Sequence, residues 1–352
     1  MADPTPSTAK ASHQASPPRS SARSWRLRSP RFSYQLQQII PDEFSESPAP
    51  VESSDFYRPS DSLEPSLPSK PSDASLPAYR LLLGMEVLLA LDRRTRAPGG
   101  TFAPNVTKAD VICRGIERIW AGTFPLSASL AEAVDFLLHE DPAGQAFLLL
   151  WKEKRHEIKE LQLVTTVRRA GFWSASQLPA QRMQCLMRGD RAPISVYFKP
   201  MRLMPSHVRS SPFFSVWGIF RYGHPETLGF NWFPQHPGSI FLDSSRNQSI
   251  LENIAAHELG HTLGLADAYG AWYRAFYEAP NTRNYLMNSN FRLQAEELAM
   301  MLQAQASGRM QFFPVKFSFK HIGKGFRDEV EYYTSRLEAM HNKDKDKYDA
   351  DS

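Results

Sequence analysis

The sequence predicts an α+β fold, in which the strands of a sheet are combined with packing helices. Four segments carry the apolar runs or the alternation of apolar and polar residues that are typical of strands: residues 81–91, 156–169, 194–198 and 240–242. Helices are predicted at residues 110–120 and 130–139, and a longer one at 249–264. These segments form a single series without an internal repeat, so we expect one domain, from residue 79 to residue 322.

The first strand and the first helix have clear local signals. Residues 81–91 are apolar except for Glu86, include Gly84 and stop at the polar run 92–94, which favours a buried strand over a short helix. Residues 110–120 place Val, Ile and Trp side chains on one helical stripe. This stripe indicates a packing helix, so we do not expect Cys113 to take part in catalysis.

The C-terminal part is predicted to contain two helices and a strand. Residues 293–305 are rich in Leu, Met and Ala, which favours a helix, and residues 310–321 alternate apolar and polar side chains as an added strand would. Residues 323–341 have the spacing of an amphipathic helix that docks on the domain. Residues 342–352 mix Lys and Asp with few apolar side chains and are expected to be disordered.

Residues 1–78 are predicted to form a disordered leader, because 18 Ser and 13 Pro leave too few apolar residues to offset the entropy of ordering. Its charge is polarised, with basic residues first and acidic residues later. Three interpretations remain open: a solvated linker, a pro-segment that covers the active site, and an export segment. The leader resembles the export segments of bacterial type III secreted effectors. That resemblance implies that a secretion chaperone binds the leader and that the protein acts in a host cytosol. If the leader is not an export segment, we expect a cytoplasmic protein.

The totals of the chain exclude several classes of protein. A net charge of +4 over 352 residues is too small to indicate nucleic-acid binding. Residues 1–5 lack the apolar stretch of a secretory signal peptide, and no apolar run is long enough to span a membrane. Cys113 and Cys185 are far apart and are expected to be reduced thiols. We therefore expect a soluble protein in a reducing environment.

The strongest functional signal is the run His-Glu-Leu-Gly-His from residue 257 to residue 261. Two histidines four residues apart lie on the same face of a helix and can share one metal ion, and Glu258 can hold a metal-bound water. Gly264 can end the helix, and Asp267 three residues later can return as a third ligand. The donor set His257, His261 and Asp267 therefore predicts one catalytic zinc ion.

The surrounding helix supports this interpretation. Ile250 and Ile254 continue the face that carries both histidines, so the imidazoles point into the protein, where a polar group without a partner is costly. The alternative is a core helix whose histidines only form hydrogen bonds. Ser249 and Glu252 have the spacing of a capping box at the start of the helix, and Asn247 is a competing cap.

Together these residues resemble the metzincin-like zinc metallopeptidases, in the snapalysin variant in which Asp replaces the third His. The resemblance covers residues 240–287. It implies a twisted mixed sheet with an active-site helix, a third-ligand turn and a methionine turn beneath the metal. The resemblance implies that His257, His261 and Asp267 bind zinc and that Glu258 is the general base. It also implies that Met287 and Gly264 are structural supports.

Two neighbouring stretches extend the resemblance. Residues 238–243 look like the last strand before the active-site helix, and residues 285–289 look like the methionine turn. Ser289 is a departure, because some metzincins have a Tyr there that stabilises the oxyanion. In such folds an edge strand of the sheet pairs with an extended peptide substrate.

The expected function is therefore that of a zinc endopeptidase, in which Glu258 activates a zinc-bound water that attacks the peptide carbonyl. His224 and His236 would be the substitute ligands if Asp267 did not bind zinc. Two alternatives remain open: a catalytically silent interaction protein stabilised by zinc, and a zinc amidase that acts on a non-peptide substrate. A structural zinc site has no use for Glu258, which counts against the first.

Overall fold

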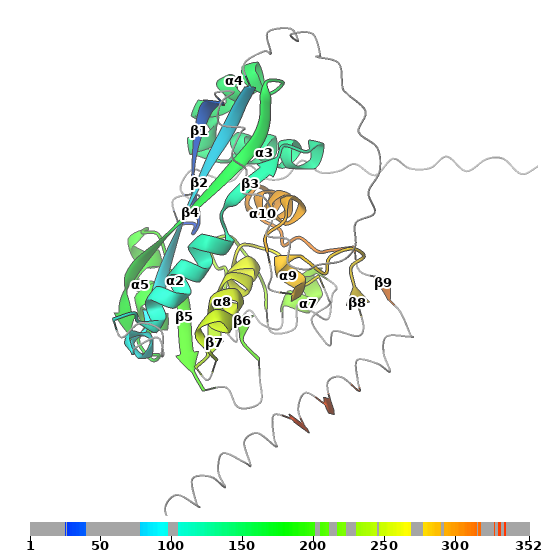
Figure 1. Cartoon of the computed structure of the whole chain (residues 1–352). Coiled ribbons are helices and arrows are strands. Elements are labelled where there is room, and N and C mark those ends of the chain that lie inside the picture. The colour runs from blue at the N-terminus through cyan, green and yellow to red at the C-terminus, as the bar shows by residue number, and fades with distance from the viewer. Residues whose placement is uncertain are drawn as a thin grey trace, which may run out of the picture.

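A mixed seven-stranded sheet organises the part of the chain that the structure describes (Figure 1). The structure is a computed structural model. It describes the following residues: 25, 27–39, 78–97, 105–200, 205–210, 217–222, 230–244, 246–268, 277–289, 292–314, 316–317 and five positions between 327 and 335.

Two long parallel strands, β2 and β4, form the centre of the sheet, whose order is β3-β4-β2-β5-β7-β6 with β1 added along β2. The bounds of the strands are β1 Arg31–Ile39, β2 Ala78–Asp92, β3 Gly122–Pro125, β4 Ile158–Trp173, β5 Ile194–Lys199, β6 His207–Arg209 and β7 Ser239–Asp243. Strands β5 and β7 continue the parallel arrangement, whereas β1, β3 and β6 are antiparallel to their neighbours. Strand β6 forms one edge of the sheet and runs antiparallel to its neighbour β7.

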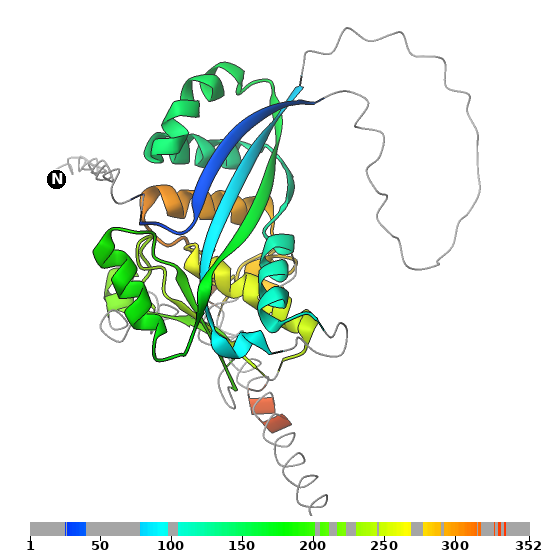
Figure 2. The ribbon, with the colours of Figure 1, turned by 90° about the vertical axis from the view of Figure 1, so that its left-hand side faces the viewer.

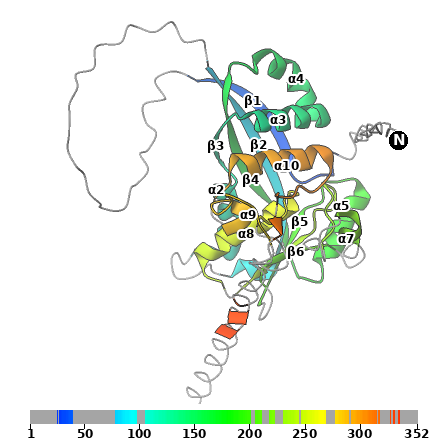
Figure 3. The ribbon, with the colours of Figure 1, turned by 90° about the vertical axis from the view of Figure 1, so that its right-hand side faces the viewer.

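Helices cover both faces of the sheet. Their bounds are α2 Lys108–Ile119, α3 Ala128–Glu140, α4 Pro142–Lys154, α5 Leu178–Arg188, α7 Trp217–Tyr222, α8 Gln248–Thr262, α9 Leu286–Ser289 and α10 Ala295–Ser307. Figures 2 and 3 show α8 and α10 on one face and α5 on the other. The fold class predicted from the sequence, α+β with a mixed sheet, is confirmed at this level. None of the described helices has both the length and the apolar character that crossing a membrane requires.

The core lies between the sheet and the face that carries α2, α3, α8 and α10. In β2 every second side chain from Leu81 to Leu89 is almost fully buried, as the two-residue period of a strand requires. Helix α2 packs closely on α8, because Gly115 has no side chain and a Cβ there would lie 2.6 Å from the Glu252 Cα. The indole of Trp120 donates a hydrogen bond to the Ala256 carbonyl at 2.9 Å. These contacts fix α8 against α2.

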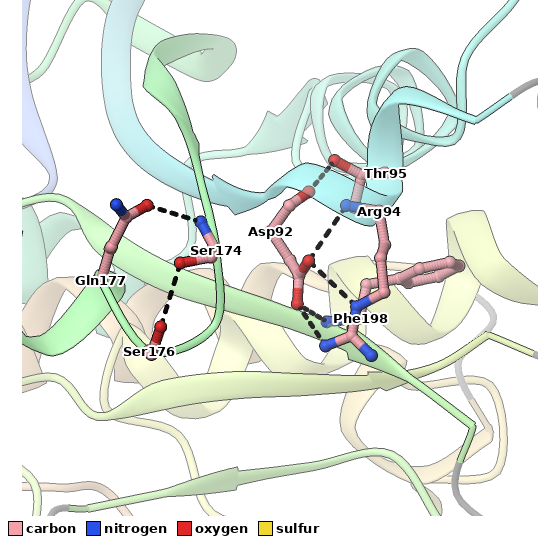
Figure 4. Close-up of polar contacts among 7 residues, drawn as sticks. All are labelled: Asp92, Arg94, Thr95, Ser174, Ser176, Gln177 and Phe198. Atoms are coloured by element: carbon pink, nitrogen blue, oxygen red, sulfur yellow. Dashed lines mark hydrogen bonds and ion pairs between the residues drawn. The ribbon is translucent and has the colours of Figure 1, made fainter.

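Strand β2 ends in a polar junction, which Figure 4 shows in close-up. The buried Asp92 accepts hydrogen bonds from the Arg94 backbone N–H at 3.0 Å and from the Arg94 guanidinium at 2.7 Å. It also accepts a bond from the Phe198 N–H of β5 at 3.4 Å. Burial raises the pKa of Asp92, but the bonds from Arg94 and Phe198 outweigh burial and hold the pKa below its ordinary value. The junction thus ties together the ends of two parallel strands.

The prediction of a disordered leader over residues 1–78 is wrong for residues 31–39. These residues form β1, which pairs antiparallel with β2 along its first half. Phe32, Tyr34 and Leu36 alternate with polar residues and turn toward the core. The high Ser and Pro content of the whole leader concealed this short alternation. Most of the remaining leader, which includes most of the predicted export segment, lies outside the described residues.

The C-terminal predictions have mixed outcomes. The helix predicted at residues 293–305 is confirmed as α10. Of the strand predicted at residues 310–321, Lys316–Phe317 form a strand, β9, which pairs with β8 at Tyr277–Glu278, whereas residues 315 and 318–321 lie outside the described residues. The helix predicted at residues 323–341 is described at five positions, each in helical conformation. The tail at residues 342–352 lies outside the described residues.

Candidate metal centre

Helix α8 is held at both ends by hydrogen bonds from side chains. Asn247 is the N-cap and accepts from the Ile250 N–H at 3.0 Å, so the competing cap is correct and the capping box predicted for Ser249 and Glu252 is wrong. At the other end, the Trp232 indole donates to the Thr262 carbonyl at 2.9 Å. The helix therefore has a fixed position from its first to its last turn.

The two histidines of α8 are oriented by backbone carbonyls. His257 Nδ1 lies 2.9 Å from the Leu286 carbonyl oxygen, and His261 Nδ1 lies 2.9 Å from the Leu265 carbonyl oxygen. A neutral imidazole that donates from Nδ1 presents the lone pair of Nε2. Such a hydrogen bond to the second ring nitrogen is the usual support of a metal-binding histidine.

The chain turns back after α8 and brings Asp267 to these imidazoles. Gly264 has φ +99°, a left-handed conformation that favours glycine, and a Cβ there would lie 2.7 Å from the Ala304 side chain. The turn is then fixed by the Ala268 N–H, which donates to the Met287 carbonyl at 3.0 Å. Asp267 Oδ1 lies 3.1 Å from His257 Nε2 and 3.4 Å from His261 Nε2. The turn therefore gathers three donor atoms, which all lie within 4.8 Å of one another.

The carboxylate of Asp267 and the two imidazoles shift one another's pKa values. Burial alone would lower the pKa of His261, but the carboxylate of Asp267 outweighs it and raises that pKa to about 9. Burial raises the pKa of Asp267, whereas His261 and His257 lower it, and the net shift is well below the ordinary value. The protein thus pairs a carboxylate with two imidazoles in a buried place.

Glu258 is the fourth functional group of this region. Its side chain is buried at 4% exposure, and its Oε2 has no hydrogen-bond partner among the described residues. Burial raises the pKa of Glu258 above its ordinary value, although His261 and His257 act against this. A buried carboxylate oxygen without a partner is costly, so the position indicates a functional role.

Met287 packs against α8 at Gly260, the glycine between the two histidines. A Cβ on Gly260 would lie 2.4 Å from the Met287 Sδ, so the glycine between the two histidines is what allows this contact. Met287 belongs to the short helix α9, whose first N–H groups need partners. The role of Met287 as a structural support of the metal centre stays a prediction.

Glu297 is a residue that the sequence analysis missed. Its buried carboxylate accepts hydrogen bonds from the backbone N–H groups of Met287 at 2.8 Å and Leu286 at 3.1 Å. Burial raises the pKa of Glu297 to about 7, despite these bonds. Because the Leu286 carbonyl contacts His257, Glu297 supports the position of that imidazole. Glu297 also accepts a hydrogen bond from the Gln294 N–H at 2.9 Å. The three-residue spacing from Gln294, typical of a capping box, is the one local sequence signal that could have indicated Glu297.

The predicted site residues therefore come together, and the substitute ligands do not join them. His257, His261 and Asp267 form the cluster, with Glu258 beside His257 in the chain. His236 lines a cavity between α5 and the sheet and is not part of the cluster. The other substitute, at position 224, lies outside the described residues.

Comparisons with models of protein families, with curated proteins and with solved structures found no match. Any assignment of function therefore depends on the geometry of the cluster and on the chemistry of its side chains.

Proposed function

We propose that the chain is a zinc-dependent endopeptidase. The observation that carries this proposal is the convergence of two imidazole Nε2 atoms and one carboxylate oxygen beside the buried Glu258. Two nitrogen donors and one oxygen donor match the ligand types of catalytic zinc sites, which keep one position open. A structural site would instead close with a fourth protein ligand.

The residues of the cluster have distinct roles in this proposal. His257, His261 and Asp267 would hold the ion, and the carbonyls of Leu286 and Leu265 keep the imidazoles in the required orientation. Zinc supplies a Lewis acid that polarises the substrate carbonyl and acidifies water. The protein contributes the rigid frame for these donors.

Glu258 is the proposed general base. It follows His257 directly on α8, and its Oε2 has no protein partner among the described residues, so this oxygen is available to a water molecule. The carboxylate accepts the proton of the attacking water and then gives it to the leaving amine.

A peptide is the proposed substrate because of the sheet. β7 is the last strand before α8, and its neighbour β6 forms an antiparallel edge at His207–Arg209. An edge strand presents unpaired backbone groups that an extended peptide can bind by adding a strand. This arrangement agrees with the metzincin-like resemblance of the sequence, in which an edge strand receives the substrate.

Metal-dependent cleavage of a peptide library tests the proposal. The full chain loaded with one equivalent of zinc is incubated with peptides from a digested cell extract, and new termini are identified by mass spectrometry. We expect a defined set of new termini that disappears with a chelator and returns when zinc is added. The proposal is rejected if the zinc-loaded chain produces no new termini and instead releases ammonia or acid from small amides, since the site would then act on non-peptide substrates.

A further inference from the structure

A cavity of about 430 Å³ lies between α5 and strands β5, β7 and β6. Ile240 and Leu242 of β7 belong to the core that α8 shares, whereas the alternate residues Ser239 and Phe241 line the cavity. Figure 2 shows α5 in front of this part of the sheet and α8 behind it. The cavity is therefore separated from the candidate metal centre by the sheet, and its size is within the range of small-molecule sites, roughly 300 to 1,000 Å³.

The charge of the lining is positive. Arg182 and Arg209 line the cavity, and the lining has no acidic residue. The guanidinium of Arg182 donates to the Gly238 carbonyl at 3.0 Å and to the Gln235 carbonyl at 3.3 Å. The described part of the chain places no carboxylate within ion-pair distance of Arg182, and burial lowers its pKa to about 10. Arg182 thus remains charged at neutral pH without a counter-ion among the described residues.

Ser195 adds a second polar group that needs a partner. It lines the same cavity from β5, is 1% exposed, and its hydroxyl has no hydrogen-bond partner within the described ranges. Buried hydroxyls are normally hydrogen-bonded, because burial without a partner costs free energy. A ligand oxygen in the cavity would satisfy both this hydroxyl and the remaining N–H groups of Arg182.

The rest of the lining is mostly apolar. The rings of Tyr197 and Phe241 stack with centroids 4.6 Å apart on neighbouring strands, and Met183 and Leu186 face them from α5. Aromatic and aliphatic walls with a few convergent polar groups are typical of sites for small organic ligands. The apolar walls therefore favour a ligand with an apolar body, and the arginines favour a negative charge on that ligand.

We propose that this cavity binds a small organic anion, whose carboxylate, sulfonate or phosphate group contacts Arg182 and Ser195 and whose apolar body lies between α5 and the Tyr197–Phe241 pair. Hydrogen bonds from a guanidinium to an oxyanion are among the strongest that proteins form. The site is independent of the proposed peptidase activity.

Two fluorescent probes with one ring framework test this proposal. We would titrate the native full chain with 8-anilinonaphthalene-1-sulfonate, which carries an anion, and with the neutral N-phenyl-1-naphthylamine. The variant Met183→Glu places a negative charge at the lining on a 56% exposed position, and Met187→Glu, on an 81% exposed position outside the lining, is the matched control. We expect Met183→Glu to weaken binding of the sulfonate about tenfold more than binding of the neutral probe, because like-charge repulsion adds to the lost apolar contact only for the sulfonate. The control should change neither.

Arg182→Met provides a second, independent readout, with thermal unfolding measured to confirm that the variant is folded. We expect loss of the sulfonate preference over the neutral probe. The proposal is overturned if the native chain does not bind the sulfonate, or if Met183→Glu and Met187→Glu weaken it equally. Because neither probe reports on hydrolysis, these outcomes do not depend on whether the chain is a peptidase.

Discussion

Replacing Glu258 by Gln should abolish peptide hydrolysis while the chain keeps one zinc ion. Gln has nearly the same shape as Glu but cannot accept a proton, and general acid–base groups contribute about 10²- to 10⁴-fold to rates. We therefore expect kcat to fall at least about a hundredfold in the library assay, with unchanged zinc content. Zinc content should not change, because the three donor atoms belong to other residues.

Glu252→Gln is the matched control for this change. Glu252 lies six residues earlier on the same helix and binds Arg118 at 3.1 Å on the surface of α2. The control should retain full activity. Equal rates for the native chain and Glu258→Gln would exclude Glu258 as the general base, and equal loss in both variants would indicate a general effect on α8.

Replacing Asp267 by Ala should remove zinc from the chain. The substitution deletes the oxygen on which both Nε2 atoms converge and leaves only two ligands. Changes of residues that merely orient a ligand weaken metal binding by about 10- to 100-fold, so we expect the loss of a ligand to exceed a hundredfold. Competition with a chromophoric chelator measures this affinity.

His236→Ala is the control for the metal measurement, since His236 is the described alternative to Asp267 as third ligand. It lines the cavity under α5 and should leave zinc affinity unchanged. Zinc retained in Asp267→Ala and lost in His236→Ala would reverse the assignment of the third ligand.

The site could be predicted from the sequence because its signals are local. The spacing of His257 and His261 fixes their common face on a helix, and Gly264 followed by Asp267 fixes a turn. Both features depend on fewer than a dozen consecutive residues. The strands β2, β4, β5 and β7 were predictable for the same reason.

The errors and omissions involve contacts between distant residues. Strand β1 pairs with residues of β2 that lie 39 to 55 positions later in the chain, and no local sequence pattern predicts that pairing. Glu297 supports His257 through the backbone of Leu286, a relation that only the folded chain contains. The identity of the helix cap, Asn247 and not Ser249, depended on the exact start of α8, which local sequence rarely determines.

The most direct test of the account is X-ray absorption at the zinc edge of the loaded full chain. We predict one zinc per chain with two imidazole nitrogens and a shell of oxygens, at about 2.0 to 2.2 Å, and without sulfur. In Asp267→Ala, any residual zinc should lose an oxygen neighbour. A chain that binds no zinc, or binds it through Cys113 or Cys185, would contradict the assignment of His257, His261 and Asp267 as the metal centre.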